Sequence, residues 1–129
     1  MTEEAFNKVK ETLLACADKT QQGKQPGYTG ESKDVLVNFK NMAARFGVDP
    51  LVVWGIYFNK HVDAVNSYIK NPNIQMGETV DSRFEDLINY IGLGEALLCD
   101  LHYPEIYAHQ KYGIYRTENG EFVAGLDDD

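Results

Sequence analysis

The stretch from Lys60 to Leu98, KHVDAVNSYIKNPNIQMGETVDSRFEDLINYIGLGEALL, decides the fold. Its first part continues an apolar helical pattern, which Pro72 and its two flanking asparagines interrupt. A second helical pattern runs from near Thr79 or Asp81 to about residue 100. The stretch therefore predicts two helices joined by an acidic loop.

Each of these helices is apolar on two faces of a helical wheel. The later helix has an expected core stripe of Phe84, Leu87, Ile88, Ile91 and Leu98, and an opposite face of Asp86, Tyr90, Leu93 and Leu97. The earlier helix has a core face of Leu51, Trp54, Phe58, Val62, Val65 and Ile69, and a second face of Val53, Tyr57, Lys60, Ala64 and Tyr68. A helix that is apolar on two sides needs cover on both. We therefore expect Asp86 at the edge of a second buried contact, and at least a dimer formed through the second faces.

Lys60 lies within the second apolar face, and its position allows two interpretations. A buried ammonium group needs a partner, which favours a Lys60–Asp86 pair or a shared anionic or metal-bound ligand. In the other interpretation the stem of Lys60 covers apolar surface while its charge stays in water.

Composition restricts the class of protein. The chain has 129 residues, 43% of them hydrophobic and 25% charged, which is typical of one globular domain. A net charge of −8 without a basic cluster disfavours binding to nucleic-acid backbone or anionic membrane. No apolar run is long enough to span a bilayer, and no signal peptide is present. We expect a cytoplasmic protein, with Cys16 and Cys99 as two buried free thiols.

The N-terminal third is expected to form two helices separated by a loop. Thr2 caps a first helix that fades before Gly23, and Gln21 to Gly30 reads as a loop. Tyr28 in that loop either folds over a ligand or packs against the helices. The apolar stripe of the first helix is Phe6, Val9, Leu13 and Cys16. A second helix starts at Glu31 or Ser32, with a core face of Val35, Phe39, Met42 and Phe46.

The remaining boundaries follow from turn residues. Gly47 ends the second helix, and Asp49 followed by Pro50 starts a third that ends near Lys70. A short fifth helix spans Glu105 to about Lys111, and Asn119-Gly120 predicts a type I′ hairpin. The fold prediction is a single all-α domain, a bundle of four to five helices over residues 2–111. A small β-hairpin over 112–125 and an acidic tail over 126–129 complete it.

Acidic residues gather where the last long helix begins. Glu78, Asp81 and Glu85 recur at i, i+3 and i+7, with Asp86 beside them. Carboxylates spaced in this way can hold Mg²⁺ when substrate phosphates complete its shell. They can equally complement the helix dipole or form surface pairs. The three histidines have no zinc-ligand spacing, and no phosphate-binding glycine loop is present.

Three segments resemble the nucleotide-modification-associated and MazG-like families, which are small all-α proteins of phages and bacteria. They are Tyr28-Thr29-Gly30-Glu31 with Val37-Asn38-Phe39-Lys40-Asn41-Met42-Ala43, Val53 to Lys60, and Glu78 to Tyr90. The likeness covers roughly residues 26 to 100. It implies an oligomeric helical bundle whose pocket is lined by Tyr28, Asn38, Lys60, Glu78, Asp81, Asp86 and Asn89. The neighbouring His61, Arg83 and Tyr90 join them as nucleotide-binding candidates.

One departure from the family bears on catalysis. Pyrophosphatase members pair a Glu-Glu-x-x-Glu helix with a Glu-x-x-Asp helix around Mg²⁺. This chain has Glu78-x-x-Asp81 but no Glu-Glu-x-x-Glu on a core helix. The resemblance therefore implies a phage-type protein that binds or processes a nucleotide, with Glu78, Asp81 and Asp86 as the ligands of any Mg²⁺. The alternatives are a Mg²⁺-dependent nucleoside triphosphate pyrophosphohydrolase and an acidic protein that inhibits a host defence protein by binding it.

Overall fold

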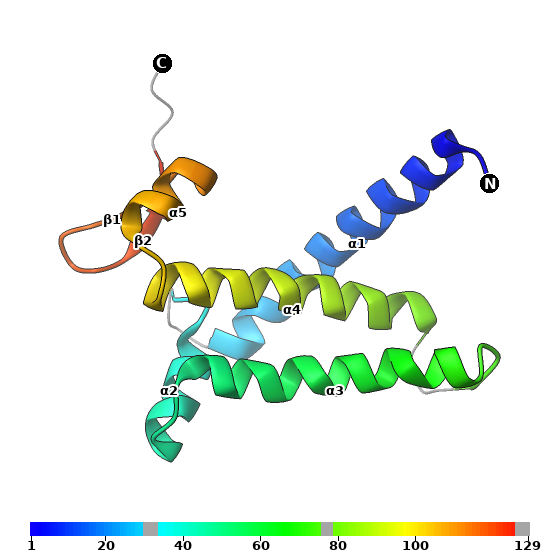
Figure 1. The fold of residues 1–129 in the computed structure, drawn as a ribbon, viewed down its shortest axis with the longest axis horizontal. Coiled ribbons are helices and arrows are strands. Elements are labelled where there is room, and N and C mark those ends of the chain that lie inside the picture. Colours follow the sequence, from blue (N-terminus) through cyan, green and yellow to red (C-terminus); the bar gives the residue numbers. More distant parts are fainter. Residues whose placement is uncertain (30–33, 76–78, 126–129) are drawn as a thin grey trace. The chain divides into compact units, whose positions relative to one another are not determined.

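The fold is seen in a computed structural model that describes residues 1–29, 34–75 and 79–125, without the side chains of residues 22–29. Five helices and one two-stranded antiparallel sheet lie within these residues (Figure 1). In chain order they are α1 (Glu3–Thr29), α2 (Val37–Phe46), α3 (Pro50–Lys70), α4 (Val80–Leu101), α5 (Glu105–Tyr112), β1 (Ile114–Arg116) and β2 (Phe122–Ala124). The predicted class, an all-α bundle with a C-terminal hairpin, is confirmed.

Several helix ends are set by the residues that the sequence indicates. The Thr2 hydroxyl accepts a hydrogen bond from Ala5 N at 3.1 Å, and the Asp49 carboxylate accepts one from Leu51 N at 2.8 Å. Gly47 ends α2 with φ +66°, the left-handed geometry that glycine adopts without strain. These predictions succeed because each depends on neighbours within three residues.

Two boundaries near the N-terminus were predicted wrongly. α1 continues through residues 21–29, where a loop was expected around Tyr28. Glycine accepts helical dihedrals and the fixed φ of Pro26 is itself helical, so these residues weaken a helix without excluding it. α2 begins only at Val37, because Asp34 forms a turn instead, accepting a hydrogen bond from Leu36 N at 2.9 Å. Glu31 and Ser32, the predicted start, lie outside the described residues.

The chain divides into two compact units, Met1–Gly94 and Glu95–Asp129, with α4 running through the boundary. The buried apolar residues of the N-terminal unit are Ala17, Leu36, Phe39, Ala43, Val53 and Tyr68. Those of the C-terminal unit are Leu97, Cys99 and Ala108. Val53, Tyr68 and Leu97 were expected to face a second subunit, but they are buried within one chain. Of the other residues predicted for that face, Tyr57 is exposed and Ala64 and Leu93 are half-buried, and the dimer stays a prediction.

The predicted core stripe of α4 is also wrong. Phe84 and Ile91 expose 41% and 58% of their surfaces, whereas Glu85 and Asp86 are buried at 9% and 8%. A helical wheel identifies two faces but does not say which one the fold covers. The expectation that Asp86 lies away from open water is confirmed.

Other predicted core positions are exposed too. They are Phe6, Val9 and Cys16 on α1, Val35 and Phe46 at the two ends of the predicted second helix, and Ile69 in the last turn of α3. Most of them lie near an end of a helix or of the chain, where fewer neighbouring elements are available for cover. Cys16 is therefore an exposed free thiol, in contrast to the buried one expected, while Cys99 is buried as predicted.

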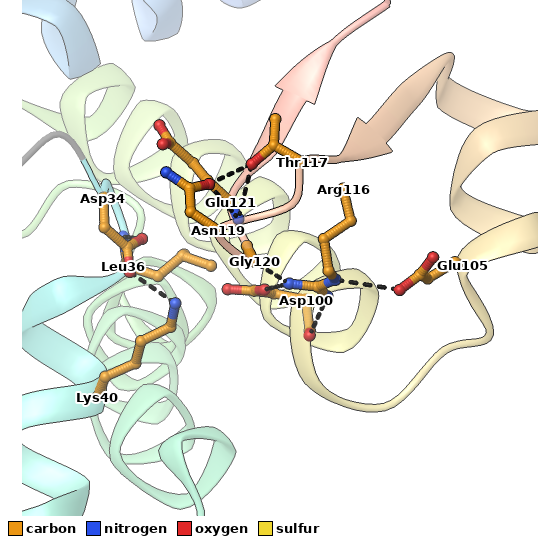
Figure 2. A network of polar contacts seen from close by, with 10 residues as sticks. All are labelled: Asp34, Leu36, Lys40, Asp100, Glu105, Arg116, Thr117, Asn119, Gly120 and Glu121. Carbon is orange, nitrogen blue, oxygen red and sulfur yellow. Dashed lines mark hydrogen bonds and ion pairs between the residues drawn. The ribbon is translucent and has the colours of Figure 1, made fainter.

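In the C-terminal unit, Arg116 ties three segments together (Figure 2). Its guanidinium donates to Asp100 Oδ1 at 3.1 Å, to the Asp100 carbonyl at 2.8 Å and to the Gly120 carbonyl at 2.7 Å. It also lies 3.3 Å from Glu105 Oε1 and 4.0 Å above the centre of the Phe122 ring. One side chain thus joins the end of α4, the start of α5 and the hairpin.

The hairpin turn differs from the predicted type I′. That turn needs positive φ at both central residues, but Gly120 has φ +85° while Asn119 does not have positive φ. Gly120 N donates to the Thr117 carbonyl at 2.9 Å, and Thr117 N donates to the Glu121 carbonyl at 2.7 Å. The loop therefore has three residues and ends in a left-handed glycine, which spares Asn119 the strained conformation.

Candidate functional site

The candidate site is built on the face of α4 that carries Glu85, Asp86, Asn89 and Tyr90, called the inner face here. Glu85 and Asp86 are the buried charged residues among those described. Residues four apart on a helix share a direction, so Glu85 aligns with Asn89 and Asp86 aligns with Tyr90. The two pairs contact different helices.

Glu85 and Asn89 contact α1. The Thr20 hydroxyl donates to Glu85 Oε1 at 3.2 Å, and Asn89 Nδ2 donates to the Ala17 carbonyl at 3.0 Å. Ala17 is fully buried, and its carbonyl is a point of contact between α1 and α4. These polar contacts reduce the cost of burying Glu85 beside an apolar core.

Asp86 and Tyr90 contact α3. Asp86 Oδ2 lies 3.8 Å from His61 Nδ1, and the His61 and Tyr90 rings lie 4.6 Å apart between centroids. The side chains of His61 and Asp86 are 17% and 10% exposed. An ion pair at this separation needs a protonated imidazole. The inner face thus combines an acceptor carboxylate, a titratable imidazole and an aromatic ring.

Further aromatic side chains surround Tyr90. Its ring lies 6.3 Å from that of Tyr57 at an interplanar angle of 26°, and Phe39 meets both rings edge-on at 6.4 Å. Trp54 Nε1 donates to the Tyr90 carbonyl at 2.6 Å, and its ring stacks on Phe58 at 4.9 Å. Tyr57 is 40% exposed, so this aromatic wall reaches solvent.

The structure brings together some of the predicted site residues. His61, Asp86, Asn89 and Tyr90 lie on the inner face or against it, and Arg83 is half-buried one turn earlier on α4. Three others, Asn38, Lys60 and Asp81, are exposed. Within the chain the structure shows no ion pair between Lys60 and Asp86, both of which it describes. The side chain of Tyr28 and the whole of Glu78 lie outside the described residues.

Magnesium ligation stays a prediction. Within residues 1–21, 34–75 and 79–125, no three His, Cys, Asp or Glu side chains group as metal ligands do. Asp81 and Asp86 differ in burial, and Glu78 is not among those residues. Glu85 and Asp86 are adjacent in sequence, but Glu85 contacts α1 and Asp86 contacts α3, so the two carboxylates do not converge on one ion.

Sequence reasoning missed three residues of the site. Glu85 was considered as part of an acidic run but was not placed among the ligands, Trp54 was assigned to the core face of its helix, and Thr20 was not considered. The adjacent Glu85-Asp86 pair in a helix interior was a usable signal, because buried carboxylates are rare without partners. The partner Thr20, 65 residues away, had no signal in the sequence.

A second polar cluster lies in the C-terminal unit. The Tyr103 and Tyr112 hydroxyls donate to the two carboxylate oxygens of Glu95 at 3.0 and 2.5 Å, and Lys111 Nζ lies near the rings of Tyr107 and Tyr112. The hydrogen bonds from Tyr112 and Tyr103 lower the pKa of Glu95 below its ordinary 4.5. The same bonds raise the pKa of each tyrosine above 10. This cluster fastens α5 and its flanks to the end of α4.

The Glu95 cluster makes the stability of the C-terminal unit depend on pH. Because the folded pKa is lowered, its contribution is present above about pH 4.5 and is lost as pH falls through the folded pKa. We expect the stability difference between the wild type and Glu95→Gln to shrink as the pH falls below that value. Urea denaturation followed by circular dichroism measures it. A difference that stays constant down to about pH 3 would contradict the role of the ionised carboxylate.

None of the helices in the described part of the chain is long and apolar enough to cross a membrane. Comparison with protein-family models, characterised proteins and solved structures finds no significant match to this chain.

Proposed function

We propose that the chain binds a nucleotide at the inner face of α4. The observation that carries this proposal is the buried carboxylate of Asp86, held between the His61 imidazole and the aromatic wall around Tyr90. Burying a carboxylate costs stability, and an ionisable group kept inside a fold at that cost is a candidate for function.

The chemistry of the three residues suits the parts of a nucleotide. Asp86 can accept hydrogen bonds from the N–H groups of a base or the hydroxyls of a ribose. A protonated His61 can donate to a phosphate oxygen, and the exposed edge of Tyr57 offers a surface for stacking. The resemblance to nucleotide-handling families supports the same assignment through Asp86 and Asn89.

Binding is preferred to hydrolysis on the ground of the sequence. The Glu-Glu-x-x-Glu segment that completes the metal cradle in pyrophosphatase members is missing. The protein would then sequester its nucleotide, in the manner of a phage product that removes a host metabolite or signal. The hydrolase alternative needs Mg²⁺ held by Glu78, Asp81 and Asp86.

A thermal-shift screen tests the proposal. Canonical, modified and cyclic nucleotides are added with and without Mg²⁺ to the wild type and to Asp86→Asn. A nucleotide at a hundred times its dissociation constant adds about 2.7 kcal/mol to stability, which is several degrees for a domain of this size. We expect a nucleotide to raise the melting temperature of the wild type. Asp86→Asn should need at least a tenfold higher nucleotide concentration for the same rise.

Asp18→Asn is the matched control, because it removes the same charge from an exposed position on α1. It should keep the full shift. A shift that requires Mg²⁺ would favour the hydrolase, to be followed by an assay of pyrophosphate release. The absence of a shift with every nucleotide, or equal shifts in Asp86→Asn and the wild type, would refute binding at the inner face.

A second candidate function, binding to a basic protein partner, is favoured by a different surface. Phe46, Val48, Val52 and Ile56 are all exposed around the junction of α2 and α3, and the chain carries a net charge of −8. An apolar patch on an acidic protein suits a partner whose apolar centre has a basic rim. Binding to such a protein that weakens with salt and ignores nucleotides would support this candidate.

A further inference from the structure

The tip of the hairpin carries an exposed asparagine directly before an exposed glycine, Asn119 and Gly120. In such a pair the backbone nitrogen of the glycine can attack the side-chain amide of the asparagine, because glycine has no side chain to obstruct the approach. Asn119 is the only asparagine of the chain that precedes a glycine. The hairpin tip is therefore the position at which this reaction is chemically easiest.

The turn directs two hydrogen-bond donors at the side-chain carbonyl of Asn119 (Figure 2). The Thr117 hydroxyl donates to Asn119 Oδ1. Glu121 N donates to the same oxygen at 3.4 Å and to Thr117 Oγ1 at 3.3 Å. The bond from Glu121 N forms an Asx turn, in which the asparagine side chain folds back along the backbone that follows it. The amide is thus held beside the peptide that contains the attacking nitrogen.

Asn119 Oδ1 is the oxygen on which negative charge develops during the attack. When the Gly120 nitrogen adds to Asn119 Cγ, the carbonyl becomes a tetrahedral centre with an oxyanion. Enzymes stabilise such an oxygen with N–H and O–H donors, and removing one donor slows them roughly 100- to 1,000-fold. The hairpin tip therefore has the donor arrangement of a small oxyanion hole.

One contact opposes the reaction. Gly120 N donates to the Thr117 carbonyl at 2.9 Å and must release that bond before it can attack. A single hydrogen bond of this kind slows the reaction by about tenfold at most. Water around the exposed turn weakens all three contacts, so the two donors together outweigh the one bond that must break.

We propose that the hairpin tip is a self-modifying site, at which Asn119 deamidates through a succinimide with the Thr117 hydroxyl and Glu121 N–H as oxyanion donors. The Gly120 nitrogen loses its proton to solvent and forms a bond to Asn119 Cγ. The Cγ–Nδ2 bond then breaks, and the nitrogen takes up a proton and leaves as ammonia. Water opens the ring at either carbonyl, which yields aspartate or isoaspartate. The net change is the uptake of water and the loss of ammonia, without oxidation or reduction.

Both products change the contacts of the hairpin. Each places a new carboxylate between Glu118 and Glu121, whose like charges repel it. Isoaspartate also adds a carbon atom to the main chain of the three-residue loop. That carbon displaces the Gly120 carbonyl, which accepts a hydrogen bond from Arg116 at 2.7 Å. The modification therefore loosens the hairpin from the network around Arg116.

Peptide mapping by mass spectrometry, during incubation in mildly alkaline buffer, tests the proposal. We expect residue 119 of the folded wild type to gain about one dalton and to appear as both aspartate and isoaspartate. Thr117→Val removes the hydroxyl donor and suits a strand end, so it should slow the reaction about tenfold. Thr117→Ser keeps a hydroxyl and should react at close to the wild-type rate. Asn66, exposed on α3 before Ser67, is the internal control and should stay unmodified.

The same proteins unfolded in guanidinium chloride separate the effect of the turn from that of the sequence. Unfolded wild type and Thr117→Val should react at equal rates, no faster than the folded wild type. An unmodified Asn119, equal rates in folded Thr117→Val and folded wild type, or a difference that persists after unfolding would each overturn the proposal. A product containing aspartate alone would overturn the succinimide route, since only a ring opens in two ways.

Discussion

Replacing Gly94 with alanine is expected to destabilise the N-terminal unit by about 1–3 kcal/mol, although alanine is ordinarily the better helix former. A methyl group at Gly94 would lie 2.5 and 2.6 Å from two ring atoms of Trp54. The indole has little freedom to move, because its Nε1 donates to the Tyr90 carbonyl at 2.6 Å and its ring stacks on Phe58. The added methyl must therefore push α4 away from α3.

Chemical denaturation followed by the fluorescence of Trp54, the single tryptophan, measures this effect. A shift of the emission in the folded state would report the displaced indole directly. Gly55→Ala is the matched control, since Gly55 is also helical but has nothing within 4 Å of its missing side chain. It should gain up to about 1 kcal/mol. If Gly94→Ala were also stabilising, the close packing of Trp54 on α4 would be wrong.

Replacing Arg116 with alanine is expected to destabilise the C-terminal unit by about 2–3 kcal/mol. The substitution removes three hydrogen bonds, the ion pairs with Asp100 and Glu105, and one cation–π contact at once. It also leaves Asp100, whose side chain is only 16% exposed, without the cation that faces it. A partly buried carboxylate that loses its counterion costs more than the loss of an ordinary surface pair.

Hydrogen exchange of the segment 105–125 measures this loss, because its amides depend on the contacts of Arg116. A change of 2–3 kcal/mol corresponds to about 30- to 150-fold faster exchange. Arg116→Lys keeps the charge but not the planar fork of donors, so its exchange rate should fall between those of the wild type and Arg116→Ala. Arg45→Ala, at an exposed position on α2, should stay within about 0.5 kcal/mol of the wild type. Equal protection in Arg116→Ala and the wild type would show that the network does not hold the unit together.

The sequence predicts those parts of the fold that depend on near neighbours. The ends of α3 and α5 and the glycine after α2 are correct because capping and turn chemistry act within a few residues. The predicted end of the first helix, before Gly23, is wrong for a related reason. Gly23, Pro26 and Gly27 lower helix propensity, but propensity is weak and the wider structure can override it.

The orientation of α4 could not be read from the sequence. Its wheel shows two apolar faces, and the choice between them depends on contacts with Thr20 and Ala17, more than sixty residues away. The candidate site shows the same contrast between residues that local sequence identifies and contacts that remote segments provide. Asp86, Asn89 and Tyr90 were identified from their motif and His61 from its place beside Lys60, whereas the partners that position them come from remote turns of α1 and α3. Asn38, Lys60 and Asp81 carry suitable chemistry, but their helices leave them exposed.

The burial of Glu85 and Asp86 and the exposure of Phe84 and Ile91 on the same helix have a consequence for the folding pathway. Turning α4 about its axis by roughly half a turn would bury Phe84 and Ile91 and return both carboxylates to water. Such a collapsed state satisfies the hydrophobic pattern of the helix and competes with the native one during folding, which is local frustration.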